Sequence, residues 1–171
     1  MKENIAHVSE GKMTEDSVFY ISAIESLGKE EQRLADFTDA LDNDPAQKKD
    51  RIAEYKCAKY RNASVSRIHN LLYHGNRVYR KPAIHLEIED CINSNDEILT
   101  LCNKAADNEK LDCKLYYGIS YIAQERIEMC LKELENANDW EKVELEERIG
   151  GMQFAKECLD EAWKKQKDVS V

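Results

Sequence analysis

Apolar residues recur along most of this chain at spacings of three, four or seven positions, the period of an amphipathic α-helix. The first stripe predicts a helix from Thr14, its expected N-cap, to about Asp42. Gly28 is expected to weaken the middle of this helix and to allow a kink there. The residues of the stripe are Val18, Ile21, Ile24, Leu27, Leu34, Phe37 and Leu41.

The sequence Asp-Asn-Asp-Pro at residues 42–45 is the clearest break in this pattern. Proline fits the first position of a helix, because its missing N–H would have no partner there, and Asp44 suits the N-cap. A second helix is therefore predicted from Pro45 to about His74, with Gly75 and Asn76 as its stop. Its stripe contains Ile52, Tyr55, Ala58, Val65, Ile68 and Leu72.

The second half of the chain predicts further helices. Residues 83–90 largely alternate apolar and polar, which taken alone favours a strand, but no second strand is available to pair with it. A helix over about residues 83–102 is therefore preferred. Residues 107–109 can cap the next helix, whose stripe runs from Leu111 to Leu134 and is the most regular in the chain.

A last helix is predicted after a break at residues 136–139. Asn138 with Glu141 three residues later matches a capping box, in which each residue's side chain bonds to the other's backbone N–H. Gly150 and Gly151 predict either a bend or a close contact with another helix. The residues expected to be buried are Trp140, Val143, Ile149, Met152, Leu159 and Trp163.

Together these helices predict a single all-α domain over residues 14–167, an up-and-down bundle of four to five long amphipathic helices. Residues 1–13 show no sustained apolar period and are expected to form a flexible tail. The chain of 171 residues holds two prolines and six glycines, too few turn signals for an all-β fold.

The cysteines and the N-terminus bear on the compartment. The six cysteines occur singly, without a Cys-x-x-Cys pair, and the N-terminus lacks the apolar run of a signal peptide. Reduced thiols in a cytoplasmic protein are therefore expected, although the even count would permit disulfides. No stretch approaches the ~20 apolar residues of a membrane span, so no membrane association is expected.

The segment from Tyr55 to Lys81, called the basic segment below, departs most from the average composition. It holds seven lysines and arginines and no acidic residue, whereas the whole chain has a formal charge of -9. Cations interleaved with aromatic rings suit an anionic partner, either a nucleic acid or an acidic protein surface. The predicted binding residues are Lys56, Lys59, Tyr60, Arg61, Arg67, Arg77, Arg80 and Lys81.

Two alternatives use the same charges differently. The cations can pair with glutamates of the chain's own acidic helices, and the tyrosines can be half-buried packing residues. The basic segment can also lie against acidic helices of further copies, which would make the protein a structural subunit of a homo-oligomer, with a homodimer left open. The leading prediction is a non-catalytic interaction or regulatory protein.

Arg67 and His74 within the basic segment are separated by six residues, which returns a helix to nearly the same face. This spacing resembles the Arg-x4-6-His motif of the HEPN ribonucleases, helical proteins that commonly dimerise so that two motifs meet. The resemblance implies a metal-independent ribonuclease as a second function. Arg67 would then stabilise phosphate charge and His74 would transfer a proton.

The remaining polar residues do not predict a metal or cofactor site. The histidines form no His-x-x-x-His or Glu-x-x-His pair, so no metal ligands are assigned. Nine acidic residues between Glu125 and Glu147 loosely resemble the Glu-x-x-Glu pairs of helical nucleotide pyrophosphatases, which bind magnesium. They are interleaved along the polar face, so a solvated acidic surface is the preferred interpretation.

Overall fold

The computed structural model describes residues 18–80 and 111–169, and all regular secondary structure in these ranges is α-helical. The prediction of an all-α arrangement of long amphipathic helices is confirmed. The predicted tail, the helix over 83–102 and the caps at Thr14 and at 107–109 lie outside the described residues. The helices are α2 (Val18–Asp42), α3 (Pro45–Asp50), α4 (Ile52–Arg80), α7 (Leu111–Leu134) and α8 (Asp139–Val169).

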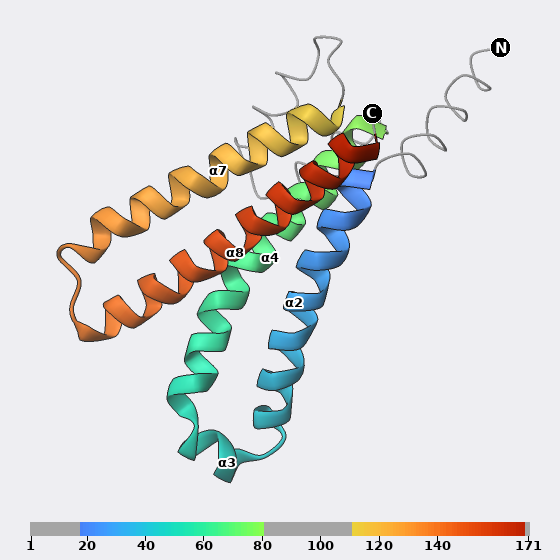
Figure 1. Ribbon diagram of the computed structural model, residues 1–171. Helices are drawn as coiled ribbons and strands as arrows, with labels where there is room; N and C mark the ends of the chain where they lie inside the picture. The colour runs from blue at the N-terminus through green and yellow to red at the C-terminus, as the bar shows by residue number, and fades with distance from the viewer. Residues whose placement is uncertain (1–17, 81–110, 170–171) are drawn as a thin grey trace.

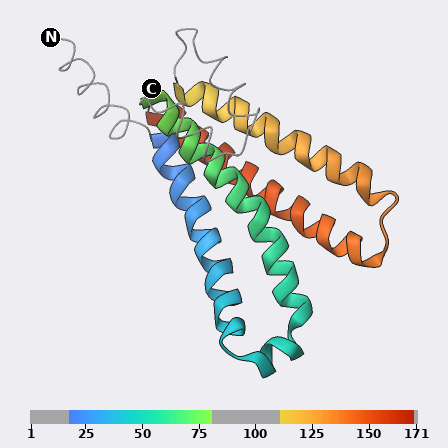
Figure 2. The same cartoon turned by 180° about the vertical axis from the view of Figure 1, so that it is seen from behind.

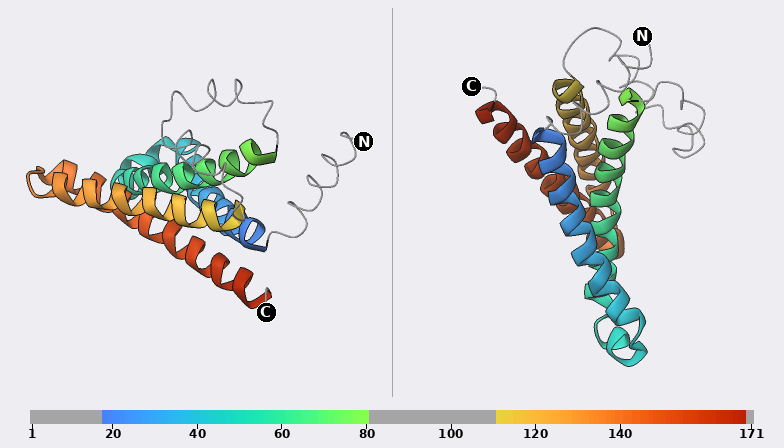
Figure 3. Two further views of the ribbon diagram at one scale, coloured as in Figure 1. Left: turned by 90° about the horizontal axis from the view of Figure 1, so that it is seen from above. Right: turned by 90° about the vertical axis from the view of Figure 1, so that its right-hand side faces the viewer.

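The long helices form two antiparallel hairpins, α2 with α4 and α7 with α8 (Figure 1). Helix α8 contacts both α2 and α4, so the two hairpins pack together along part of their length. Beyond this shared region they diverge, and the end that carries α3 lies far from the loop between α7 and α8 (Figures 1 and 2). The view from above also shows the loop between α7 and α8 apart from the end that carries α3 (Figure 3, left).

The hydrophobic core lies where the four long helices meet. Each helix contributes side chains to one continuous cluster, because each has a single apolar stripe. Phe19, Ile68, Ile119 and Leu159 are completely buried and come from α2, α4, α7 and α8 respectively. The four helices therefore share one core, as expected for helices whose stability comes from joint burial.

Aromatic rings close the core at the end where the chain's described C-terminus lies. Trp163 stacks on Tyr116 at a centroid distance of 5.0 Å, and Phe19 meets the Trp163 ring edge-on at 5.7 Å. The Tyr116 hydroxyl donates to Asp160 Oδ1 at 2.7 Å. Burial, with the nearby Asp160 carboxylate, raises the pKa of Tyr116 to about 12, so this hydroxyl remains a donor at any physiological pH.

Both predicted helix starts within the described residues are confirmed. Asp44 Oδ1 accepts from Gln47 N at 3.2 Å, with Pro45 in the first position of α3. At the start of α8, Asn138 Oδ1 accepts from Glu141 N and Glu141 Oε2 accepts from Asn138 N, both at 3.0 Å. This reciprocal pair is a capping box, and it fixes where the chain turns from α7 into α8.

Other boundaries differ from the predictions. The second helix breaks at Arg51, so that α3 and α4 are separate, and α2 continues unbroken through Gly28. The predicted stop at Gly75 and Asn76 is wrong, since α4 continues to Arg80 and both residues are buried. A Cβ at Gly75 would lie 2.9 Å from Leu115 Cδ2, so this glycine lies in close contact with α7 and the Leu115 side chain would have to shift to admit a larger residue.

Two residues of α8 that the sequence predicts to be buried are exposed. Trp140 is 76% exposed and Val143 is 42% exposed, which makes that prediction wrong. Both precede the stretch of α8 that packs on the rest of the bundle, whose buried residues begin at Leu145. An apolar stripe is buried only where a neighbouring helix covers it, and the sequence pattern does not show where that cover ends.

The predicted close contact at the glycine pair is present and joins α8 to α4. A Cβ built on Gly151 would lie 2.6 Å from the Arg61 carbonyl oxygen and 2.8 Å from Ser64 Cβ. The Ser64 hydroxyl also donates to the Arg148 carbonyl oxygen at 2.8 Å. Only a residue without a side chain lets the two backbones come this close.

Replacing Gly151 by alanine tests this contact. We expect Gly151→Ala to lower the free energy of unfolding by about 1–3 kcal/mol, because the new methyl group must push α8 away from α4. The matched control is Gly28→Ala in α2, where the nearest atom to a Cβ is His69 Nε2 at an ordinary 3.8 Å. That change should instead stabilise by about 0.5–1 kcal/mol, since alanine favours the helix. Urea unfolding measures the free energy of unfolding of both variants. An unchanged free energy for Gly151→Ala would contradict the close contact between α8 and α4.

Candidate interaction surface

Arg61, the centre of the basic segment, is engaged within the fold. Its Nε donates to Glu30 Oε1 at 3.2 Å, and its guanidinium lies over the Phe154 ring at 5.3 Å. Arg33 donates to the same Glu30 carboxylate at 2.7 and 2.9 Å. The Glu30 side chain is only 11% exposed, so this group links α2, α4 and α8 and is not displayed to a partner.

His69 also faces α2. Its Nδ1 lies 3.2 Å from Glu31 Oε2, and the Ser66 hydroxyl lies 3.3 Å from Glu31 Oε1. Part of the basic segment is therefore matched by carboxylates of the neighbouring helix, as the first of the two alternatives expects. These contacts lie on the side of α4 that faces α2. They do not involve the side chains on the outer side of the first turns of α4.

Lys56 and Lys59 lie on that outer side and contact aromatic rings. Lys56 Nζ lies 4.9 Å from the centroid of the exposed Trp140 ring on α8, and Lys59 Nζ lies 5.5 Å from that of Tyr55. Among residues 18–80 and 111–169, neither ammonium group forms an ion pair with a carboxylate. The carboxylate near Lys59 is that of Asp42, which forms an ion pair with Lys48 at 2.6 Å.

Tyr60 borders this group on the side of α8. The Arg148 guanidinium lies over its ring at 5.7 Å, and Glu144 Oε1 accepts from Arg148 at 2.8 and 3.0 Å. The half-buried Tyr60 ring thus joins α4 to α8. We call Tyr55, Lys56, Lys59 and Tyr60 of α4 together with Trp140 of α8 the cation–aromatic surface.

The other predicted binding residues lie further along α4. Arg67 and His74 are both half-buried and two turns apart on one helix, as the resemblance to the ribonuclease motif requires. Nothing about the reaction follows from this placement, and catalysis by this pair stays a prediction. Arg77 and Arg80 belong to the last turn of α4, and Lys81 lies outside the described residues.

Trp140 is the member of the cation–aromatic surface that comes from α8, and the sequence predicts it to be buried instead of a binding residue. Arg148 of α8, which lies over the Tyr60 ring, is also absent from the predicted binding residues. The capping box places Trp140 in the first turn of α8, and a first-turn residue at the far end of a hairpin has few neighbours to cover it. The capping box can be read from the sequence, so the exposed position of Trp140 could have been predicted. The position of Arg148 over Tyr60 depends on how α8 crosses α4, which the sequence does not show.

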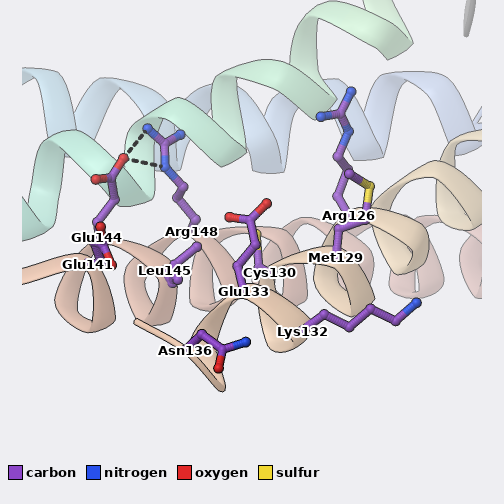
Figure 4. A pocket seen from close by; sticks show the side chains of 10 residues that line it. All are labelled: Arg126, Met129, Cys130, Lys132, Glu133, Asn136, Glu141, Glu144, Leu145 and Arg148. Carbon is purple, nitrogen blue, oxygen red and sulfur yellow. Dashed lines mark hydrogen bonds and ion pairs between the residues drawn. The ribbon is translucent and has the colours of Figure 1, made fainter. Parts of the chain in front are cut away.

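A groove of about 770 Å³ runs along α7 and α8 next to this site. Its apolar lining includes Met129, Cys130 and Leu145, and burial raises the pKa of the Cys130 thiol. Figure 4 shows the Glu133 carboxylate turned to the same side as Arg148, while Lys132 points away. The groove therefore combines an apolar lining with charged edges.

The cysteines within residues 18–80 and 111–169 are all free thiols, namely Cys57, Cys113, Cys130 and Cys158. Cys158 is buried, and this burial raises the pKa of its thiol to about 11, which keeps it protonated and unreactive. Cys57 also has a raised pKa, caused first by burial and then by the charge of Glu147. Burial is the largest cause of the raised pKa at Cys57, Cys130 and Cys158, and at Cys130 it outweighs the lowering effect of the nearby Arg148 and Arg126.

Across the part of the chain that the structure describes, no three His, Cys, Asp or Glu side chains are placed to hold a metal ion. No described helix combines the length and the apolar character needed to cross a bilayer. Comparisons with protein-family models, curated proteins and solved structures found no match for this chain.

The Glu30 carboxylate makes a pH-dependent contribution to stability that can be measured. Hydrogen bonds from Arg33 first, and then from Arg61, hold the pKa of Glu30 below its ordinary value of 4.5, against burial that raises it. The ionised carboxylate therefore stabilises the fold fully above the ordinary pKa. This stabilisation is lost as the pH falls through the lower pKa of the folded state.

We expect Glu30→Gln to reduce the free energy of unfolding near neutral pH, and to reduce it progressively less as the pH falls below 4.5. Urea unfolding at a series of pH values measures the difference. Glu25→Gln, at an exposed position of the same helix, is the control and should have little effect throughout. An equal loss from Glu30→Gln at acid and neutral pH would show that the carboxylate charge is not involved.

Proposed function

We propose that this protein is a non-catalytic interaction or regulatory protein that binds an acidic protein surface through the cation–aromatic surface. The observation that carries the proposal is that Lys56 and Lys59 rest on aromatic rings, with no carboxylate partner among the described residues. Ammonium groups held in this way keep their charge available, and an acidic partner can approach them without first breaking an ion pair.

The neighbours of these lysines favour a protein partner over a nucleic acid. Trp140 and Ile52 expose large apolar side chains beside them, and such residues anchor protein interfaces, where a few aromatic side chains carry most of the binding energy. The chain's formal charge of -9 opposes the approach of a polyphosphate. An acidic amphipathic helix would satisfy both the apolar and the cationic parts of the surface.

The proposal assigns different roles to the predicted binding residues. Lys56, Lys59 and Tyr60 would contact the partner together with Trp140, whereas Arg61 supports the fold through Glu30. The free thiols at the described cysteines are compatible with the reducing cytoplasm, which we propose as the location.

Charge reversal at Lys56 and Lys59 tests the proposal. We expect the wild-type protein to bind a fluorescein-labelled amphipathic peptide with a glutamate face and a leucine face, and Lys56→Glu/Lys59→Glu to weaken this binding by about tenfold or more. Fluorescence anisotropy measures the affinity. The exposed Trp140 should also shift its emission to the blue on binding, since the peptide would remove it from water.

The control variant is Lys29→Glu/Lys164→Glu, which makes the same change in net charge at exposed positions of α2 and α8. It should bind the peptide as the wild type does. Equal binding by the two double variants would remove the proposal. Tighter binding of a labelled single-stranded RNA than of the peptide would replace the acidic protein partner by a nucleic acid.

A further inference from the structure

The region around the α7–α8 loop has the opposite charge to the outer side of α4. Between residues 125 and 148 there are nine acidic and four basic residues, a formal charge of -5, and we call this stretch the acidic arm. In contrast, α4 from Tyr55 to Arg80 contains no acidic residue. Glu128, Glu133, Glu135, Asp139 and Glu141 of the acidic arm are exposed.

The acidic arm also exposes apolar side chains. Met129 and Leu131 on α7 and Trp140 and Val143 on α8 are each between 42% and 76% exposed. Trp140 and Val143 are three positions apart and share one side of α8, whereas Met129 and Leu131 are two apart and face different sides of α7. The groove of about 770 Å³ shown in Figure 4 lies in the same arm.

Trp140 lies at the boundary between these two regions. On one side the Lys56 ammonium covers its ring at 4.9 Å, and on the other side the chain leads directly into the exposed carboxylates of Asp139 and Glu135. One continuous surface therefore carries a basic part, an apolar centre and an acidic part. Such a surface is self-complementary, because a twofold rotation about its centre places the basic part on the acidic part.

We propose that the partner of the cation–aromatic surface is the acidic arm of a second copy of this chain. This inference rests on the proposed function and names its partner. The two copies would form a closed twofold dimer in which Trp140 of each copy lies near the axis. Lys56 and Lys59 of one copy would face Glu133 and Glu135 of its partner, and the same contact would form twice.

The acidic arm offers the second copy a groove, lined by residues of α7 and α8. The two hairpin ends diverge, and the first turns of α8 lie between the end of α7 and the start of α4 (Figures 1 and 2). Met129 and Leu145 in this groove can contact the aliphatic stem of a lysine while Glu133 and Glu141 receive its ammonium group, although Arg126 and Lys132 also line the groove. Arg148 in the same groove is already paired with Glu144 at 2.8 Å.

The energetics predict a reversible dimer. Exposed ion pairs contribute only ~0.2–1 kcal/mol each, so the apolar contacts around Trp140 must provide most of the affinity. The charges then select the orientation and make association sensitive to salt. The apolar contacts and the charges can therefore be tested separately, the first by substitution of Trp140 and the second by charge reversal and by salt.

The experiment measures the mass of the full chain in solution by sedimentation equilibrium over a range of concentrations at low and high salt. We expect a monomer–dimer equilibrium that weakens at high salt. Lys56→Glu/Lys59→Glu alone and Glu133→Lys/Glu135→Lys alone should each shift it toward the monomer by about tenfold or more. Trp140→Ala should do the same at every salt concentration.

Mixing the two charge variants gives the decisive result. In a heterodimer of these variants both contacts again join opposite charges, so the mixture should dimerise although neither variant does so alone. This restoration also shows that both variants are folded. Lys29→Glu/Lys164→Glu is the control and should dimerise as the wild type does.

Two outcomes would overturn the inference. A wild-type protein that is monomeric at all concentrations excludes self-association, and if it still binds the glutamate–leucine peptide the proposed function stands with a different partner. A dimer that persists in both charge variants is held by another surface. A protein that neither dimerises nor binds the peptide would remove the proposed function as well.

Discussion

The close contact between α8 and α4 at Gly151 is the constraint on which the rest of the structure depends. A glycine lets the α8 backbone reach the Arg61 carbonyl oxygen, and the Ser64 hydroxyl adds a hydrogen bond to the Arg148 carbonyl oxygen. This contact fixes where the two hairpins cross. On the side of the crossing toward Phe19, four helices bury one core, and on the other side the hairpins diverge and leave Trp140 in water.

The crossing also divides the charges of the basic segment into two groups. Close to the crossing, Arg61 pairs with Glu30 and lies over Phe154, so its charge contributes to the fold. Further down α4, Lys56 and Lys59 contact aromatic rings and remain available to a partner. The same compositional feature therefore supports folding at one end and, in our proposal, recognition at the other. The average charge of the segment does not reveal this division.

Local signals in the sequence were sufficient for the helix class and for the two helix starts. Asp44 with Pro45, and Asn138 with Glu141, act on neighbouring backbone groups, so their effect can be inferred without knowing the fold. The predicted helix stop at Gly75 is wrong because glycine occurs both at helix ends and at close helix contacts, and the contact with Leu115 is not visible in the sequence. The burial of Trp140 likewise depends on a distant helix.

The central claim is that Lys56 and Lys59 are accessible in the isolated protein and are the groups that a partner covers. Footprinting of lysine acylation by mass spectrometry tests it directly, with dilute protein compared with protein bound to an acidic surface. The account predicts that in dilute protein the exposed Lys59 is modified as readily as Lys29 and the half-buried Lys56 is modified more slowly, and that both become protected on binding whereas Lys29 does not. Protection of Lys56 and Lys59 already in the dilute monomer would contradict the account.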